Sequence, residues 1–351
     1  MLTVRFSDAL ASIGEAAFAY CRNLVGIQFP PSLTAIENHA FYLCEALQRI
    51  QIPDSVCALG ESAFEECSHL ENVAVGNGIT KIEPHTFSKC MLLKDVSLPD
   101  HIKEIGDFAF SQCLDLTDIN VPKELRLIGN SAFFSCSNLL EFPLPDGVVR
   151  IGEEAFKECR MLTGIAIPES VKQIGKEAFS QCSMLAEASL PTTLRYISEG
   201  MFEYCISLKN IVLPETVKRI EKNAFRRCVN LETVVLPESV LRIEEDAFES
   251  CGLKCIVIPE AVNYIAETAF DGCYDLIICA PYGSYAASYA RRCGIKHVYT
   301  EDVEEMKKNP PSGKKPSILQ RLSKKWEYTA IVCSLLYKSK EPERQDANVT
   351  G

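Results

Sequence analysis

The chain has 351 residues, a hydrophobic content of 47% and a formal net charge of −11 at pH 7. This acidity argues against a nucleic-acid-binding protein, because an acidic surface repels phosphate, and no apolar run reaches the ~18 residues of a membrane span. Seventeen cysteines are an odd number, so one chain cannot pair them all in disulfides; the composition indicates a soluble protein of a reducing compartment.

A repeat of 23 residues runs through most of the chain. A phenylalanine recurs at this spacing, a cysteine follows three positions after each one, and the last copy comes one residue early. Self-similarity at a fixed period of this length is the sequence signature of a solenoid. The phenylalanines are Phe18, Phe41, Phe64, Phe87, Phe110, Phe133, Phe156, Phe179, Phe202, Phe225, Phe248 and Phe270.

The first residues already belong to this repeat. Val4 and Phe6 match Ile27 and Phe29 one period later, so the sequence begins inside a unit with no capping segment before it. Because repeat arrays normally need a polar terminal cap, we expect a C-terminal part of a longer protein. The alternative is a first strand with an open edge. The segment MLTVRFSDAL also lacks the basic start and apolar core of a signal peptide.

The sequence of each unit predicts a strand, a proline turn, a second short extended segment and a helical turn. Ile211 and Leu213 alternate with Asn210 and Val212, which is the period-2 pattern of a strand. Pro214 ends this strand because proline has no amide to donate to a neighbouring strand. The sequence therefore places one strand of a parallel sheet in every unit.

The segment KEAFSQC, residues 176–182, carries the predicted helical turn. Ala178, Phe179 and Cys182 are spaced by three and four residues, which places them on one helical face. One unit cannot bury this face alone, but stacked copies can. We therefore predict an α/β repeat solenoid, a right-handed horseshoe of about twelve 23-residue units with a parallel sheet on its concave side.

The consensus C-x-x-L-x-x-I-x-L-P-x-S-V-x-x-I-G-x-x-A-F resembles the BspA-type leucine-rich repeat over about residues 1–299. The resemblance implies a leucine-rich-repeat horseshoe that is not an enzyme, needs no cofactor and binds a protein or peptide. It also implies an adhesin-like role at a cell surface, with host or extracellular-matrix proteins as candidate ligands. The missing signal and the odd cysteine count instead favour an intracellular scaffold without an adhesive role, so the localisation stays open.

The repeated cysteines, from Cys21 to Cys273, allow three interpretations. A reduced packing ladder is favoured, because cysteine is small and usually buried and no catalyst needs twelve nucleophiles in register. Disulfides between adjacent rungs and a metal site are the alternatives, and Cys251 and Cys255 come nearest to zinc spacing. Cys279 is placed at an inward strand position. No HExxH, GxSxG, Walker or GxGxxG motif occurs, so we expect no catalytic or metal site.

The outward positions of the predicted strand form the candidate binding surface, because the concave strand face of a solenoid is its usual recognition surface. Its first part is acidic, with like charges that repel on successive rungs, and its last part is apolar. This pattern predicts a basic or mixed peptide ligand; the alternative is a solvated face whose charges are screened by salt. The candidate residues are Asp95, Asp118, Glu141, Glu187, Asn120, Val212, Val235 and Val257.

The repeat array is expected to span residues 1–280 and to be followed by a capping segment at 281–299. We predict a short helix from Ser284, Gly294 at its C-terminal cap and a last strand at Ile295–Tyr299. A Pro/Lys-rich linker should follow at 300–317, then an amphipathic basic helix at 318–338 and a disordered end at 339–351.

The predicted helix at 318–338 is a candidate for peripheral contact with a membrane. Residues 307–325 hold seven cations and no acid, which favours an anionic surface. The alternative is a helix that docks back on the array or a disordered basic tail.

Overall fold

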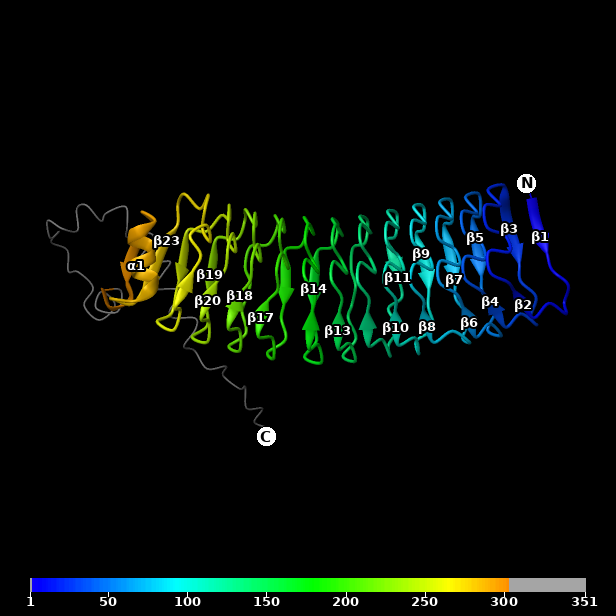
Figure 1. The fold of residues 1–351 in the computed structure, drawn as a ribbon, viewed down its shortest axis with the longest axis horizontal. Helices are drawn as coiled ribbons and strands as arrows, with labels where there is room; N and C mark the ends of the chain where they lie inside the picture. Colours follow the sequence, from blue (N-terminus) through cyan, green and yellow to red (C-terminus); the bar gives the residue numbers. More distant parts are fainter. Residues whose placement is uncertain (1, 303–351) are drawn as a thin grey trace, which may run out of the picture.

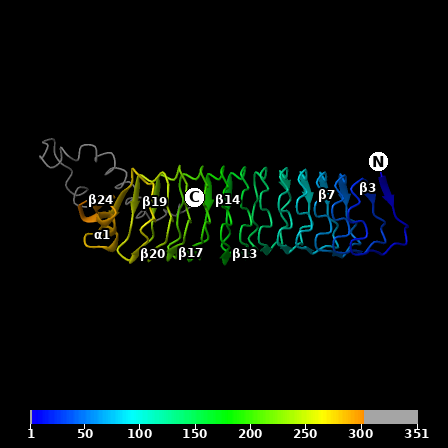
Figure 2. The ribbon, with the colours of Figure 1, turned by 45° about the horizontal axis from the view of Figure 1, so that its top comes forward.

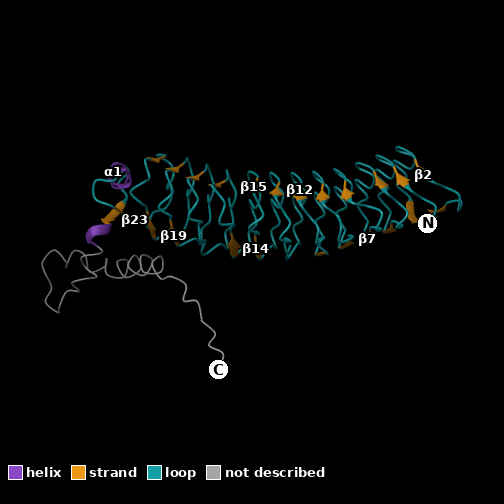
Figure 3. Cartoon of the chain, turned by 90° about the horizontal axis from the view of Figure 1, so that it is seen from below, coloured by secondary structure: helices purple, strands orange, loops and turns teal. Residues whose placement is uncertain are grey.

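The computed structural model describes residues 2–302, which form one elongated solenoid (Figure 1). Each turn of the chain is a rung that stacks on the next, in sequence order from the N-terminus to the C-terminal helix (Figures 1 and 2). The stack bows only gently along its length (Figure 3). Residues 23 apart pair in parallel from rung to rung. The predicted solenoid of 23-residue units with parallel sheets is therefore confirmed.

One side of the solenoid carries the longer strand of each rung, and we call its outer surface the long-strand face. The strands form three parallel sheets, ordered β1-β3-β5-β7-β9-β11, β14-β16 and β19-β21-β23-β24. Their bounds are β1 (Leu2–Arg5), β3 (Leu24–Gln28), β5 (Arg49–Gln51), β7 (Asn72–Ala74), β9 (Asp95–Ser97), β11 (Asp118–Ile119), β14 (Gly164–Ala166), β16 (Glu187–Ser189), β19 (Thr233–Val235), β21 (Cys255–Val257), β23 (Ile277–Ala280) and β24 (Lys296–Tyr299).

A second side carries two-residue strands, each ending on a buried aliphatic side chain that faces the core. Their sheets are β2-β4-β6, β15-β13-β12-β10-β8 and β17-β18-β20-β22. The bounds are β2 (Ser12–Ile13), β4 (Ala35–Ile36), β6 (Ala58–Leu59), β8 (Lys81–Ile82), β10 (Glu104–Ile105), β12 (Leu127–Ile128), β13 (Arg150–Ile151), β15 (Gln173–Ile174), β17 (Tyr196–Ile197), β18 (Arg219–Ile220), β20 (Arg242–Ile243) and β22 (Tyr264–Ile265).

The predicted helical turn is wrong. Residues 176–182 form consecutive tight turns, with Glu177 at φ 52° and Gln181 at φ 61°. The backbone N–H groups of Glu177, Phe179 and Gln181 donate to carbonyls of the following rung at 2.8, 3.1 and 2.6 Å. An α-helix would use these donors within its own segment. Hydrogen bonding between rungs therefore holds left-handed residues where local spacing indicated a helix, and the pattern recurs along the stack.

Phenylalanine rings form the centre of the core. From Phe41 to Phe270 each ring stacks on the next, with centroids 5.2 to 5.9 Å apart and planes within 15° of parallel. Most of these side chains are fully buried. Stacked aromatic pairs add to the free energy of area burial, so the ladder stabilises every rung-to-rung contact.

A close approach between rungs explains the glycine after the short strand in several units. A Cβ atom on Gly175 would lie 2.3 Å from the backbone nitrogen of Glu153, a distance that no side chain tolerates. Gly129 and Gly152 would meet the preceding rung in the same way. Glycine at this corner therefore permits the tight stacking of backbones.

The C-terminal end of the described chain is closed by α1 (Tyr285–Arg292) and β24. Ser284 is the N-cap of α1 and accepts the Ala287 N–H at 3.2 Å, and Gly294 has φ 69°. The buried ring of Tyr289 lies 6.1 Å from that of Phe270, so α1 continues the aromatic core. No helix within residues 2–302 is long and apolar enough to cross a membrane. The predictions for 318–338 and 339–351, and for the linker after residue 302, lie outside the described residues.

Candidate functional site

The acidic candidates lie exposed on the long-strand face. Asp95 and Asp118 pair directly in register across β9 and β11, and both side chains point to solvent. Glu141 and Glu187 are also exposed, two rungs apart. Neighbouring strands lie about 4.8 Å apart, so the face presents closely spaced carboxylates along the solenoid axis.

None of these four carboxylates forms an ion pair with another residue of the described chain, 2–302. Asp95 accepts one hydrogen bond, from the Asn72 side chain at 2.7 Å. Several acids on the other sides are paired across rungs, as in Lys157–Glu177 at 2.6 Å. Arg49 and Lys209 line the same two grooves, but neither forms an ion pair with these four carboxylates, so a further cationic group would gain from approaching them.

Two shallow grooves run along this face. The first, of about 600 Å³, is lined by residues of β3, β5, β7, β9 and β11 together with Asn120, and it includes Asp95 and Asp118. The second, of about 730 Å³, includes Glu141, Glu187 and Val212. The structure thus gathers six of the eight candidate residues into two neighbouring grooves. Val235 and Val257 line neither.

The second groove begins at a rung that carries a proline, Pro143. The Asn120 N–H donates to the Val96 carbonyl of the preceding rung at 3.4 Å. Pro143 occupies the same position one rung later and has no N–H. The rung between β11 and β14 contains no strand on the long-strand face, although Phe142 remains in the core.

The Asn120 side chain has a structural role beside this interruption. Its Oδ1 accepts the Leu98 N–H at 2.6 Å, and its Nδ2 donates to the Leu98 carbonyl at 2.5 Å. The amide group therefore acts as one more peptide unit of the sheet, and its polar atoms are not both free for a ligand. The sequence pattern placed Asn120 on this face without revealing these bonds.

The predicted apolar strip changes along its length. Val212 is 84% exposed, Val235 is half-buried and Val257 is only 9% exposed. Register also corrects the placement of Cys279, which pairs with Val257 on the outward side; the inward position belongs to Ile278 beside Ile256. The C-terminal end of the long-strand face is therefore apolar and buried.

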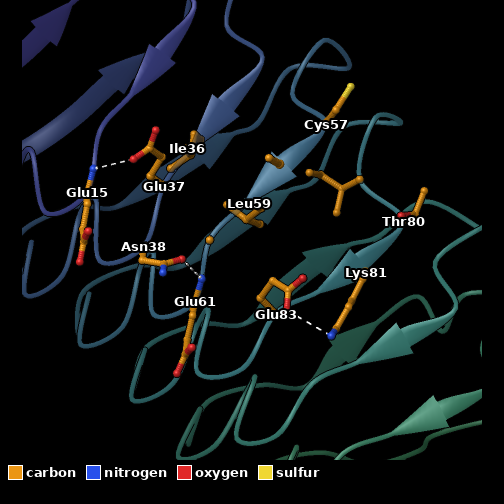
Figure 4. Close-up of a pocket in the computed structure, with 13 residues that line it drawn as sticks. Glu15, Ile36, Glu37, Asn38, Cys57, Leu59, Glu61, Thr80, Lys81 and Glu83 are labelled. Carbon is orange, nitrogen blue, oxygen red and sulfur yellow. Dashed lines mark hydrogen bonds and ion pairs between the residues drawn. The ribbon is translucent and has the colours of Figure 1, made fainter.

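Sequence reasoning missed a third groove, on the side of the short strands (Figure 4). Its volume is about 490 Å³. Its polar groups bond to adjacent rungs: Glu37 Oε2 accepts the Glu15 N–H at 3.2 Å, and Asn38 Oδ1 accepts the Glu61 N–H at 3.0 Å. Lys81 pairs with Glu104 of the following rung at 3.1 Å. Because these contacts link rungs, we interpret this groove as structural.

The thiol groups of the ladder are poor candidates for chemistry. From Cys44 to Cys251 the ladder cysteines are buried. Desolvation raises the pKa of Cys44 to about 12, because burial disfavours the charged thiolate. Each Sγ instead lies 2.9 to 3.3 Å from a backbone carbonyl of the preceding rung. Within residues 2–302 no group of three or more histidine, cysteine or acidic residues is arranged to hold a metal ion.

Comparison with known proteins assigns the family. The model described as BspA type leucine rich repeat region matches residues 1–115, 67–185, 103–232 and 150–277. The chain belongs to the BspA-type leucine-rich repeat family. Members of this family are repeat scaffolds and are generally non-catalytic. The family assignment agrees with the 23-residue rungs described above.

A solved structure shows the same fold for this leucine-rich repeat chain. It is similar to a leucine-rich repeat protein from Bacteroides ovatus at 27% identity and a TM-score of 0.72, over 85% of this chain and 83% of that one. It is also similar to a leucine rich cell surface protein from Faecalibacterium prausnitzii, at 26% identity and a TM-score of 0.45, over 80% and 85%. No curated protein matches the sequence.

Proposed function

We propose that this leucine-rich repeat chain is a non-catalytic scaffold that recognises a protein or peptide carrying basic groups through the long-strand face. The observation that carries the proposal is the unpaired acidity of Asp95, Asp118, Glu141 and Glu187, in a molecule whose other sides pair many of their acids across rungs. A surface under selection for stability alone would gain from cations at these positions.

The shape of the face favours an extended ligand. The two grooves follow one another along the solenoid and meet between the rungs of Asn120 and Pro143, so a ligand that spans both crosses several rungs. Arginine side chains bind carboxylates through two parallel hydrogen bonds. A peptide with arginine or lysine at intervals matches both the spacing and the charge of Asp95 and Asp118.

The cellular setting is a second part of the proposal. Adhesion to a host or matrix protein at a cell surface is the setting that the family suggests. An intracellular scaffold would use the same face with a different partner. Labelling intact cells with a membrane-impermeant reagent separates the two settings, because only a surface protein becomes labelled.

A displayed random-peptide library tests the binding mode. The full chain, immobilised, should select peptides enriched in arginine and lysine. A variant with Asp95→Asn, Asp118→Asn and Glu141→Gln should lose this enrichment, since its groove lacks the carboxylates. The result rests on the sequence statistics of defined peptides, so the natural ligand does not have to be identified first.

A matched variant controls for net charge. Glu15, Glu61 and Glu124 are exposed acids away from the long-strand face, and changing all three to glutamine removes the same charge. This control should retain the basic enrichment. Equal loss in both variants, or a selection without charge bias, rules out the long-strand face as a basic-peptide site.

A further inference from the structure

The outward side chains at the C-terminal end of the long-strand face are buried, although their counterparts in earlier rungs are open. Cys255 is 0% exposed, Val257 9% and Ile277 4%, whereas Val212 is 84% exposed. Cys255, Val257 and Ile277 have paired strands on both sides, but so does Asp95, which is exposed, so sheet pairing alone does not account for their burial. A cover must lie over β21 and β23.

The named elements of the described chain do not provide this cover. The helix α1 contacts β22, β23 and β24, and it lies across the solenoid from β19 (Figure 3). Its Tyr289 faces the core, where the hydroxyl donates to the Glu267 carbonyl at 3.2 Å. The strand β24 extends the sheet beside β23 and does not cross it. Neither α1 nor β24 therefore accounts for the burial of the outward side chains Cys255 and Val257 of β21.

The chain beyond the described residues begins beside this surface. The described chain ends at Asp302, three residues after β24, and β24 belongs to the same sheet as β21 and β23. Residues 303–317 reach up to ~50 Å when extended. Three strand spacings, from β24 back to β19, amount to only ~15 Å. A segment that follows residue 317 can therefore reach the apolar surface without strain.

The sequence of 318–338 matches this surface in chemistry. Leu322, Trp326 and Ala330 are spaced so that a helix would place them on one face. Such an apolar face matches the apolar surface formed by Cys255, Val257 and Ile277. Residues 303–351 hold ten lysines and arginines against six acids, so they carry +4 and residues 1–302 carry −15. The array attracts this segment electrostatically, and the same −15 opposes approach to an anionic membrane.

We propose that residues 318–338 dock on the C-terminal end of the long-strand face, over Cys255, Val257 and Ile277. Docking buries the apolar end of the face within the same chain and leaves the acidic grooves open. It does not depend on the proposed peptide ligand, because it uses different rungs. The proposed occupant is a segment of this chain. The proposal is overturned if a second copy or a membrane covers this surface instead, or if nothing covers it.

Trp326 offers a direct reporter, because it is the only tryptophan of the chain. In the full chain its emission should be blue-shifted and shielded from acrylamide. A variant with Leu322→Glu and Ala330→Glu should shift the emission to the red and remove the shielding. A control with Gln320→Glu and Tyr328→Glu adds the same charge on other faces of the segment and should behave like the parent chain.

Labelling of Cys255 gives a second readout on the array itself. In the Leu322→Glu/Ala330→Glu variant its alkylation, followed by peptide mass spectrometry, should accelerate by about tenfold or more, because labelling follows the opening of the cover. Cys228 lies in the buried ladder and should stay protected, which shows that the array remains folded. Equal labelling of Cys255 in parent and variant overturns the proposal.

Dilution of the protein and addition of lipid vesicles distinguish the other possible covers of this surface. Protection of Cys255 should be independent of protein concentration if the cover belongs to the same chain. Protection that disappears on dilution identifies a second copy and overturns the proposal. Solvent-exposed Trp326 emission that turns blue only when vesicles with anionic lipid are added identifies a membrane contact and overturns it equally.

Discussion

The Sγ of Cys182 lies 3.1 Å from the carbonyl oxygen of Phe156 in the preceding rung. The same carbonyl accepts the Cys159 N–H at 3.1 Å, so one oxygen joins a turn to the turn above it. Equivalent contacts recur from Cys44 to Cys273. A cysteine at this position fills a small space and also supplies a weak donor for a buried acceptor.

Cys182→Ala should destabilise the array by about 1–2 kcal/mol, because it leaves a small cavity and removes the second hydrogen bond to Phe156. The urea midpoint of the full chain measures the effect. Cys57→Ala is the control, since Cys57 is exposed, and its effect should stay within about 0.5 kcal/mol. Equal midpoints for the two variants would show that the ladder thiol contributes nothing.

Stability should fall in alkaline solution because of the buried thiols. The pKa of Cys44 is raised by desolvation from 9.0 to about 12, and that of Cys273 likewise. A group with a raised folded pKa stabilises the fold fully below its unfolded pKa and loses this contribution as the pH rises toward the folded value. The urea midpoint should therefore decline from about pH 9 to about pH 12, and Cys44→Ala should make the decline shallower. A flat profile across this window contradicts the prediction.

Asp118→Asn should stabilise the array by a few tenths of a kcal/mol, because it removes repulsion with Asp95 on the adjacent strand. The gain should shrink as salt is added, since salt screens exposed charges. Asp100→Asn is the contrasting variant: Asp100 pairs with Lys123 at 2.6 Å, so it should give no gain. Thermal melts at low and high salt measure both.

Asn120→Ala should cost about 1–2 kcal/mol, because it leaves both backbone groups of Leu98 without their side-chain partner. Gln51→Ala serves as the comparison, at an equally exposed position of the same face. Chemical denaturation of the two variants should separate them clearly. Similar midpoints would mean that water replaces the Asn120 amide without loss.

The period and the alternation of apolar residues were enough to predict the solenoid, its parallel strands and the exposure of Asp95, Asp118, Glu141 and Glu187. The turn around Phe179 could not be predicted in this way. Local spacing indicated a helix, but the backbone donors bond to the next rung, and residues such as Glu177 adopt positive φ without any glycine to signal it.

The candidate site shows the same limit. The alternation of apolar and polar residues along each strand predicted which side chains point outward, and it placed Val212, Val235 and Val257 on one strip. It could not show that Val257 is buried while Val212 is open, because that difference depends on what lies over the sheet and not on the strand itself. The side-chain bonds of Asn120 to Leu98 likewise arise from contacts between rungs.

Site-directed photocrosslinking tests most directly whether the long-strand face is the recognition surface. A photoreactive residue at Ser97, which ends β9 and lines the first groove, should crosslink to a selected basic peptide. The same group at Thr80, which lines the groove on the short-strand side, should not. Crosslinking from position 80 with none from position 97 would contradict recognition through the long-strand face.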